Sequence, residues 1–154
     1  MQITASGVAF APWGLNLGYW MSRPSSPPIV IDLFCGAGGL SEGLTQSGFD
    51  VRVGLDFDPH ALATFRANHP QAESICADVS SVSAADLIAA AGTTEIDLIT
   101  GGPSCQGFST HGKRIEEDQR NFLFREFVRV VREVKPKFFL MENVKGLLAY
   151  SKGH

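Results

Sequence analysis

The sequence predicts an α/β domain built on a doubly wound, mostly parallel sheet. Short apolar runs of strand length alternate with helical segments from residue 29 onward, which is typical of parallel strands joined by right-handed crossovers. The length of 154 residues, with 44% hydrophobic and 19% charged residues, suits a single globular domain with a real core. No apolar run reaches the roughly 18 residues of a membrane helix, so a membrane-spanning protein is not expected.

Five apolar runs have strand length and are bounded by turn residues. They cover residues 29–34, 50–55, 73–76, 96–100 and 138–141. Gly36-Ala37-Gly38-Gly39 follows the first run, and glycines so closely spaced predict a tight turn. A polar loop to about Asp118 is expected after the fourth run.

Four helices are expected between these strands, over about residues 40–47, 59–68, 84–91 and 121–135. Their end signals are Gly48 as a C-cap, Pro59 in a first turn, Ser83 as an N-cap, Gly92 as a C-cap and Pro136 as a stop. In the last helix the predicted apolar stripe is Phe124, Phe127, Val128, Val131 and Val134. Three arginines share its opposite side, Arg125, Arg129 and Arg132.

Residues 1–27 differ from the rest of the chain, because they mix glycine, proline and aromatic residues without a period. The first basic residue is Arg23, so the charged start of a signal peptide is missing, and Met21 reads as an alternative start. Residues 1–27 are therefore expected to be a disordered extension and residues 28–154 the folded part.

Charge and cysteine content limit which partners and which cellular compartment are expected. Residues 1–110 carry a net charge of −7 and residues 111–154 a net charge of +4, which permits one local basic patch but disfavours a protein that coats nucleic acid unaided. Three cysteines are too few for a disulfide scaffold, so reduced thiols in an intracellular protein are expected.

Unusual residues follow the carboxyl ends of all five predicted strands, where doubly wound sheets bind ligands. The glycine turn follows the first strand, and the others are followed by Asp56, Asp78, Cys105 and Glu142. Gly36, Gly38 and Gly39 together with Asp56 fit a nucleoside whose ribose hydroxyls bond to the carboxylate, although Ser41 replaces the third glycine of the dinucleotide fingerprint. Asp78 could instead simply cap the following turn.

Cys105 lies in a loop rich in glycine, proline and serine, where packing gives little reason for a thiol. A stabilised thiolate there would be a nucleophile, whereas Cys35 and Cys76 read as structural. Glu142 enters the wall of a predicted cleft, where desolvation would raise its pKa and make it a proton donor. The alternative is that Glu142 and Asn143 merely begin a helix.

Five motifs occur in the order and at the spacing of one known family, over residues 29 to about 151. They are Asp32-Leu33-Phe34-Cys35-Gly36-Ala37-Gly38-Gly39, Asp56-Phe57, Asp78-Val79, Pro103-Ser104-Cys105-Gln106 and Glu142-Asn143-Val144. On these residues the chain resembles the amino-terminal part of the C5-cytosine DNA methyltransferases. The resemblance implies a Rossmann-like methyltransferase fold, incomplete in this chain, and a role in DNA methylation and restriction-modification. It also implies a location in the cytoplasm of a bacterium or the nucleus of a eukaryote.

The resemblance also implies the site. The cofactor would be S-adenosylmethionine, with S-adenosylhomocysteine as product and no metal, held by Phe34, Gly36, Ala37, Gly38, Gly39, Asp56, Phe57, Asp78, Val79, Gly102 and Leu123. The catalytic residues would be Cys105, Glu142 and Asn143. Cys105 would attack C6 of a cytosine flipped out of double-stranded DNA, and Glu142 would act at N3.

The sequence departs from the family pattern in two ways that affect the expected activity. Ser104 stands where proline usually precedes the cysteine, which would loosen the nucleophile loop. The later arginine motif and the target-recognition region are absent before His154, so the expectation is a truncated or split enzyme that is inactive alone and has a complementary chain as partner. An RNA cytosine methyltransferase, a non-catalytic binding fragment and an NAD-binding module remain as alternatives.

Overall fold

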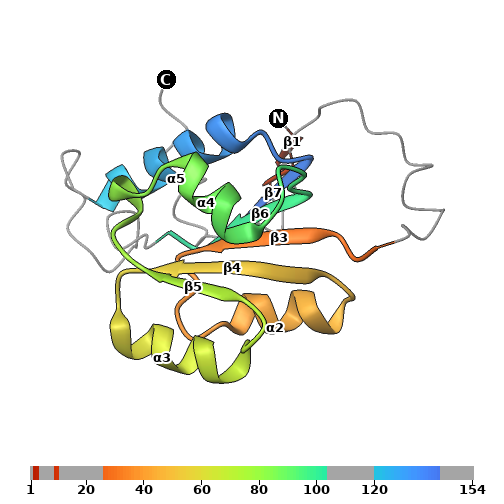
Figure 1. The fold of residues 1–154 in the computed structure, drawn as a ribbon. Helices are drawn as coiled ribbons and strands as arrows, with labels where there is room; N and C mark the ends of the chain where they lie inside the picture. Colours follow the sequence, from red (N-terminus) through yellow and green to blue (C-terminus); the bar gives the residue numbers. More distant parts are fainter. Residues whose placement is uncertain (1, 4–8, 11–25, 104–119, 143–154) are drawn as a thin grey trace.

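The computed structural model describes residues 2–3, 9–10, 26–103 and 120–142. Five strands form one sheet in which every neighbouring pair is parallel, in the order β5-β4-β3-β6-β7 (Figure 1). Their bounds are β3 Ile29–Leu33, β4 Asp50–Asp56, β5 Glu73–Cys76, β6 Leu98–Gly101 and β7 Phe138–Met141. The predicted parallel α/β sheet is confirmed.

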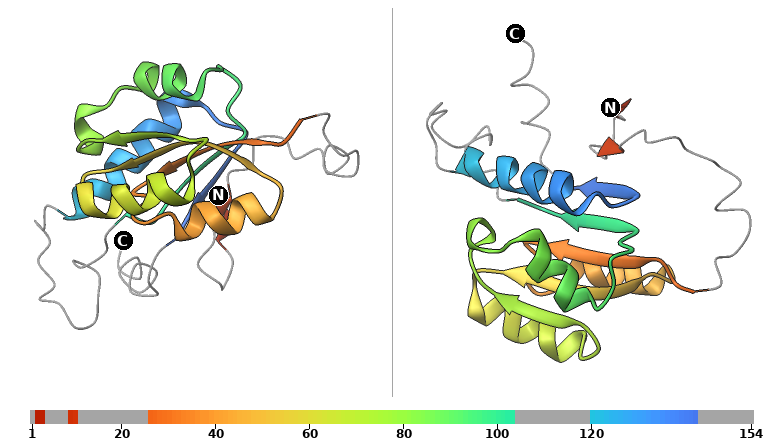
Figure 2. Two further views of the ribbon diagram at one scale, coloured as in Figure 1. Left: turned by 60° about the horizontal axis from the view of Figure 1, so that its bottom comes forward. Right: turned by 45° about the horizontal axis from the view of Figure 1, so that its top comes forward.

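Helices cover both faces of the sheet. On one face lie α2 (Gly39–Gln46) and α3 (Pro59–Asn68), and on the other lie α4 (Ala84–Ala91) and α5 (Arg120–Val134) (Figures 1 and 2). A single 3-10 turn, η1 (Val79–Ser81), precedes α4. The chain first builds β3, β4 and β5 outward in one direction and then returns to place β6 and β7 on the other side of β3, which is the doubly wound topology.

Local signals set most helix ends where the sequence predicts them. Ser83 and Asp86 form a reciprocal capping box at the start of α4, and Gly92 ends that helix with φ of 70°. Asp58 caps α3 by accepting hydrogen bonds from the first-turn N–H groups of His60 and Ala61. The C-cap of α2 is Ser47 rather than the predicted Gly48, which follows it with φ of 87°.

Two apolar layers hold the helices on the sheet. Alternate residues of β3 point to opposite faces, so Ile31 and Leu33 join the layer under α4 and α5, whereas Val30 joins the layer under α2 and α3. The buried stripe of α5 consists of Phe127, Val130 and Val134. The prediction of Phe127 and Val134 is confirmed, and Phe124 and Val131 are half-buried against the same layer. The predicted stripe leaves out Val130 and wrongly includes Val128, which is half-buried and is not part of that layer.

Within residues 1–25 the structure describes two short strands, β1 (Gln2–Ile3) and β2 (Ala9–Phe10), which pair antiparallel. The expectation of a disordered extension otherwise falls outside the described residues. Among the helices of the described part, none is long and apolar enough to cross a membrane.

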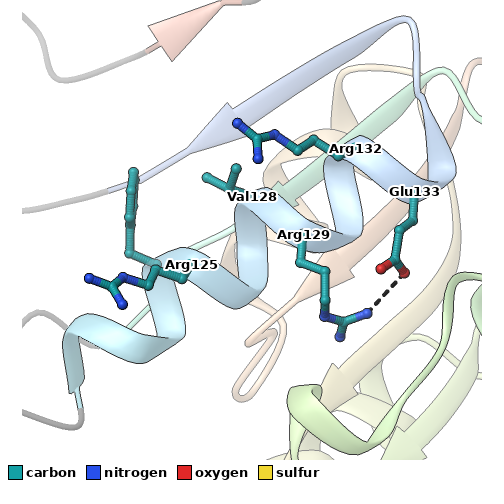
Figure 3. Close-up of a pocket in the computed structure, with 6 residues that line it drawn as sticks. Arg125, Val128, Arg129, Arg132 and Glu133 are labelled. Atoms are coloured by element: carbon teal, nitrogen blue, oxygen red, sulfur yellow. Dashed lines mark hydrogen bonds and ion pairs between the residues drawn. The ribbon is translucent and has the colours of Figure 1, made fainter.

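Arg129 on α5 binds other parts of the protein instead of extending a free basic face. Its guanidinium donates to the backbone carbonyl oxygens of Val79 and Val82, at 3.0 and 3.1 Å, and pairs with Glu126 and Glu133. Figure 3 shows the pair with Glu133 beside a shallow groove of about 400 Å³ on this helix. The predicted three-arginine face is thus reduced to the two exposed arginines, Arg125 and Arg132.

Asp32 is a carboxyl group inside the sheet, with an exposed fraction of 1%. Its Oδ2 accepts a 2.5 Å hydrogen bond from the hydroxyl of Ser41 on α2, and its Oδ1 has no partner in the described part of the chain. Burial raises the pKa of Asp32 to about 6, although the Ser41 hydrogen bond opposes the shift. The pair connects the central strand to the first turn of α2.

We expect Arg129→Met to lower the free energy of unfolding by about 1–3 kcal/mol, because it removes two hydrogen bonds from a charged donor and leaves the buried Glu126 unpaired. Urea denaturation measures this. Arg125→Met is the matched control on the exposed side of the same helix and should change stability by no more than about 0.5 kcal/mol. Equal effects of the two substitutions would contradict the structural role of Arg129.

We expect Asp32 to make the protein less stable as pH rises from about 4 to 6. The folded state holds a proton on Asp32 in that window that the unfolded state has lost, so the stabilisation is complete below pH 4 and falls by about 2–3 kcal/mol through pH 6. Asp32→Asn should remove this dependence, whereas Ser41→Ala should shift it to higher pH. Denaturation curves between pH 4 and 8 test both, and a pH-independent difference between wild type and Asp32→Asn would refute the assignment.

Candidate active site

The candidate site lies at the carboxyl ends of the strands, where the strand order reverses between β3 and β6. The chain leaves β3 toward α2 on one face of the sheet and leaves β6 toward α5 on the other (Figure 1). In doubly wound sheets this switch point is where ligands bind. Gly101 at the end of β6 lies so close to β3 that a side chain there would overlap the Leu33 carbonyl oxygen.

The loop after β3 has an unusual backbone. Phe34, Gly36 and Gly38 all adopt left-handed conformations, with φ of 60°, 53° and 93°. For a phenylalanine this costs about 1–2 kcal/mol, and such strain tends to be retained at binding sites. A methyl group added at Gly36 or Gly39 would meet no described atom within 4 Å, so the backbone is open to a ligand at these two positions.

Asp56 fixes this loop from the neighbouring strand. Its Oδ2 accepts the N–H of Gly36 at 2.8 Å, and its Oδ1 accepts the N–H of Asp58 at 2.9 Å. Each carboxylate oxygen can accept a further hydrogen bond, so the group is held in place and can still bind hydroxyls. Phe57 follows with 73% of its surface exposed, which leaves an aromatic face available for stacking beside the carboxylate.

Asp78 and Val79 are engaged in the fold. Asp78 caps η1 and accepts both the N–H and the hydroxyl of Ser80, and these hydrogen bonds lower the pKa of its carboxyl. The side chain of Val79 is buried in the layer under α4 and α5, against which Leu123 also packs. The turn-capping alternative for Asp78 is therefore realised, and its predicted contact with the cofactor stays a prediction.

Glu142 follows β7, the strand that pairs with β6. Its N–H donates to the carbonyl oxygen of Gly101 at 3.0 Å, and a methyl group on Gly102 would lie 3.2 Å from its Oε2. The glutamate carboxylate thus lies against Gly102, as the prediction of one site requires. The expected burial of Glu142 is wrong, because its side chain is exposed at the end of β7, an edge strand of the sheet.

The remaining predicted residues divide into two groups. Ala37 is exposed in the loop after β3, whereas Cys105 and Asn143 lie outside the described residues, as does the expected polar loop. Cys35 is buried, and its desolvation together with the charges of Asp32 and Asp56 raises the pKa of its thiol well above the ordinary value. Cys35 therefore stays protonated and is buried, as expected of a structural cysteine, whereas Cys76, for which the same was predicted, is exposed.

Other features of the site were not anticipated. The sequence reasoning missed the buried link between Asp32 and Ser41 and a hydrogen bond from His69 to the loop after β3. Asp32 could have been noticed because it is a charged residue inside the apolar run 29–34. No sequence pattern indicated a role for His69. Within the described residues no group of three or more histidine, cysteine or acidic side chains could hold a metal ion.

The comparisons with known proteins agree with one another. Residues 29–154 match the family model for C-5 cytosine-specific DNA methylases. Type II methyltransferase M.XorII of Xanthomonas oryzae pv. oryzae is 50% identical over 122 residues, which are 78% of this chain and 29% of that protein. Type II methyltransferase M.AquIA of a Picosynechococcus species is 46% identical over 127 residues, which are 80% of this chain and 51% of that protein.

Solved structures give the same result. A prophage-encoded protein of Escherichia coli, described as a DNA modification methyltransferase, superposes with a TM-score of 0.70 at 42% identity, over 81% of this chain and 35% of that one. The Dnmt2 methyltransferase of Schizosaccharomyces pombe superposes with a TM-score of 0.62 at 27% identity, over 79% and 36%. This chain thus spans between about a third and a half of its relatives, and it belongs to the C-5 cytosine-specific DNA methylase family.

Proposed function

We propose that this chain supplies the cofactor-binding crevice and the nucleophile of a DNA (cytosine-5-)-methyltransferase. The observation that carries the proposal is the strained loop after β3, open at Gly36 and Gly39 and held by Asp56 beside the exposed Phe57. The family relationship and the type II methyltransferase relatives support DNA as the substrate. The enzyme would then act inside the cell, where DNA and the cofactor are found.

The loop and its neighbours fit S-adenosylmethionine. Gly36 and Gly39 would let the methionine part approach the backbone, Asp56 would accept hydrogen bonds from the ribose hydroxyls, and Phe57 would lie against the adenine. When bound, the cofactor supplies an electrophilic methyl group and leaves as S-adenosylhomocysteine. Ala37, Gly102 and Leu123 complete the proposed cofactor-binding set, together with Phe34, Gly38, Asp78 and Val79.

The chemistry would be carried by a cysteine and a glutamate. The Cys105 thiolate would add to C6 of a flipped cytosine while Glu142 hydrogen bonds to or protonates N3, which makes C5 nucleophilic enough to accept a methyl group. Loss of the proton from C5 and expulsion of the thiolate would restore the aromatic ring. Asn143 would orient this glutamate. The position of the Glu142 carboxylate against Gly102, which is three positions before Cys105 in the sequence, supports this pairing.

We expect the chain to bind S-adenosylhomocysteine or S-adenosylmethionine, and Asp56→Asn to weaken that binding by about tenfold or more, because a neutral amide loses the charge-assisted hydrogen bonds to the ribose. Isothermal titration calorimetry measures the affinity. Asp50→Asn, at the opposite end of the same strand, is the matched control and should leave the affinity unchanged. Equal affinities of wild type and Asp56→Asn would contradict the ribose assignment.

We expect residues 29–154 to support methyl transfer when they replace the matching segment of M.XorII, since the rest of that relative would supply what this chain does not span. Transfer of labelled methyl groups to DNA and, in parallel, to RNA measures activity and substrate class. Cys105→Ala in the chimera should abolish transfer, and DNA containing 5-fluorocytosine should trap Cys105 covalently, because its C5 substituent cannot leave. An adduct on Cys35 or Cys76, or preferential methylation of RNA, would overturn the proposal.

A further inference from the structure

His69 lies beneath the loop after β3, although 31 positions separate it from Gly38 in the sequence. It follows α3 directly, and only 1% of its surface is exposed. Its Nε2 lies 3.2 Å from the carbonyl oxygen of Gly38. Since a carbonyl oxygen can only accept, Nε2 must carry the proton in this hydrogen bond.

The same carbonyl oxygen begins helix α2. It accepts the N–H of Glu42 at 2.8 Å, which is the first hydrogen bond of that helix, in addition to the imidazole N–H. Gly38 is the N-cap of α2 and is left-handed. The hydrogen bond from His69 therefore acts on the one peptide group at which the loop ends and the helix begins.

Ring packing reinforces the hydrogen bond. The rings of His69 and Phe65 are 4.8 Å apart, and both lie against the α-carbon of Gly38. A methyl group there would come to 2.6 Å from Nε2 of His69 and 3.0 Å from the Phe65 ring. Gly54 on β4 is needed for the same reason, because a side chain at that position would overlap Phe65. The two rings fill the space between α3, the loop and the sheet.

We propose that His69 is a positioning residue for the cofactor loop: its Nε2–H holds the Gly38 peptide so that Gly36 and Gly39 stay open on the opposite, ligand-facing side. This inference rests on the proposed function, because it takes that side to be where S-adenosylmethionine binds. Without the hydrogen bond the loop would populate other conformations. The cofactor would then have to restore the competent conformation, which reduces its apparent affinity.

Two substitutions separate the donor from the ring. His69→Phe keeps an aromatic ring and loses the N–H, whereas His69→Gln keeps an N–H at the distance of Nε2 and loses the ring. If His69 positions the loop, His69→Phe should raise the Kd for S-adenosylhomocysteine by about three- to tenfold, the effect of one buried hydrogen bond. His69→Gln should stay within about twofold of wild type. His60→Phe, on the exposed side of α3, is the matched control and should bind as wild type does.

Hydrogen exchange gives a readout that does not need the ligand. In the free chain, the amide of Glu42 should exchange severalfold faster in His69→Phe than in His69→Gln, since its acceptor is the same Gly38 oxygen. Nitrogen NMR of wild type should show the Nε2-protonated tautomer of His69. If wild type binds no cofactor, the proposed function fails, yet exchange at Glu42 still decides whether His69 holds the loop.

The proposal would be overturned by unchanged exchange at Glu42 in His69→Phe. It would also be overturned if His69→Phe and His69→Gln weakened cofactor binding equally and in proportion to their loss of thermal stability, because a merely structural ring would produce that result.

Discussion

The left-handed backbone of the loop between β3 and α2 is the constraint on which the site depends. Phe34, Gly36 and Gly38 all have positive φ, and a chain segment of this kind keeps its shape only when its surroundings hold it. Asp56 holds Gly36 from β4, and His69 holds Gly38 from beyond α3. These hydrogen bonds fix the loop while a methyl group at Gly36 or Gly39 would still meet no described atom within 4 Å, so the strained backbone would be preorganised for the proposed ligand.

The two halves of the sheet contribute differently. The half containing β3, β4 and β5 supplies the fixed glycine loop, the carboxylate of Asp56 and the exposed ring of Phe57. The half containing β6 and β7 supplies the close approach of Gly101 to β3 and the carboxylate of Glu142 against Gly102. The first half would bind the nucleoside of the proposed cofactor, and the second brings an acid to the strand end from which the chain continues to Cys105. The matched segment of this chain covers 29% and 51% of two of its relatives, so the proposed enzyme would need chain beyond this segment.

Two charged side chains that the sequence pattern suggested for ligand binding, Arg129 and Asp78, make hydrogen bonds within the fold. Arg129 connects α5 to the turn before α4 through two backbone carbonyl oxygens and two carboxylates. Asp78 completes a turn through Ser80. In both cases the partners that the structure shows are backbone groups or side chains close by in the sequence, and the proposed contact of Asp78 with the cofactor would be made in addition to them.

The sequence by itself determined the features that depend on near neighbours or on a general rule of topology. Ser83, Asp86 and Gly92 mark both ends of α4, and the strands at residues 73–76 and 138–141 lie where their apolar runs are, because caps and turns depend on residues within one helical turn. The gathering of unusual residues at one edge followed from parallel topology. Only the tertiary structure decided that Arg129 binds Val79 and Val82, that Glu142 is exposed, and that Gly38 must be glycine because of His69 and Phe65. The hydrogen bonds of His69 and Arg129 join segments some thirty to fifty residues apart. Hydrophobic periodicity does not predict which polar group will bind which backbone carbonyl oxygen across such a separation.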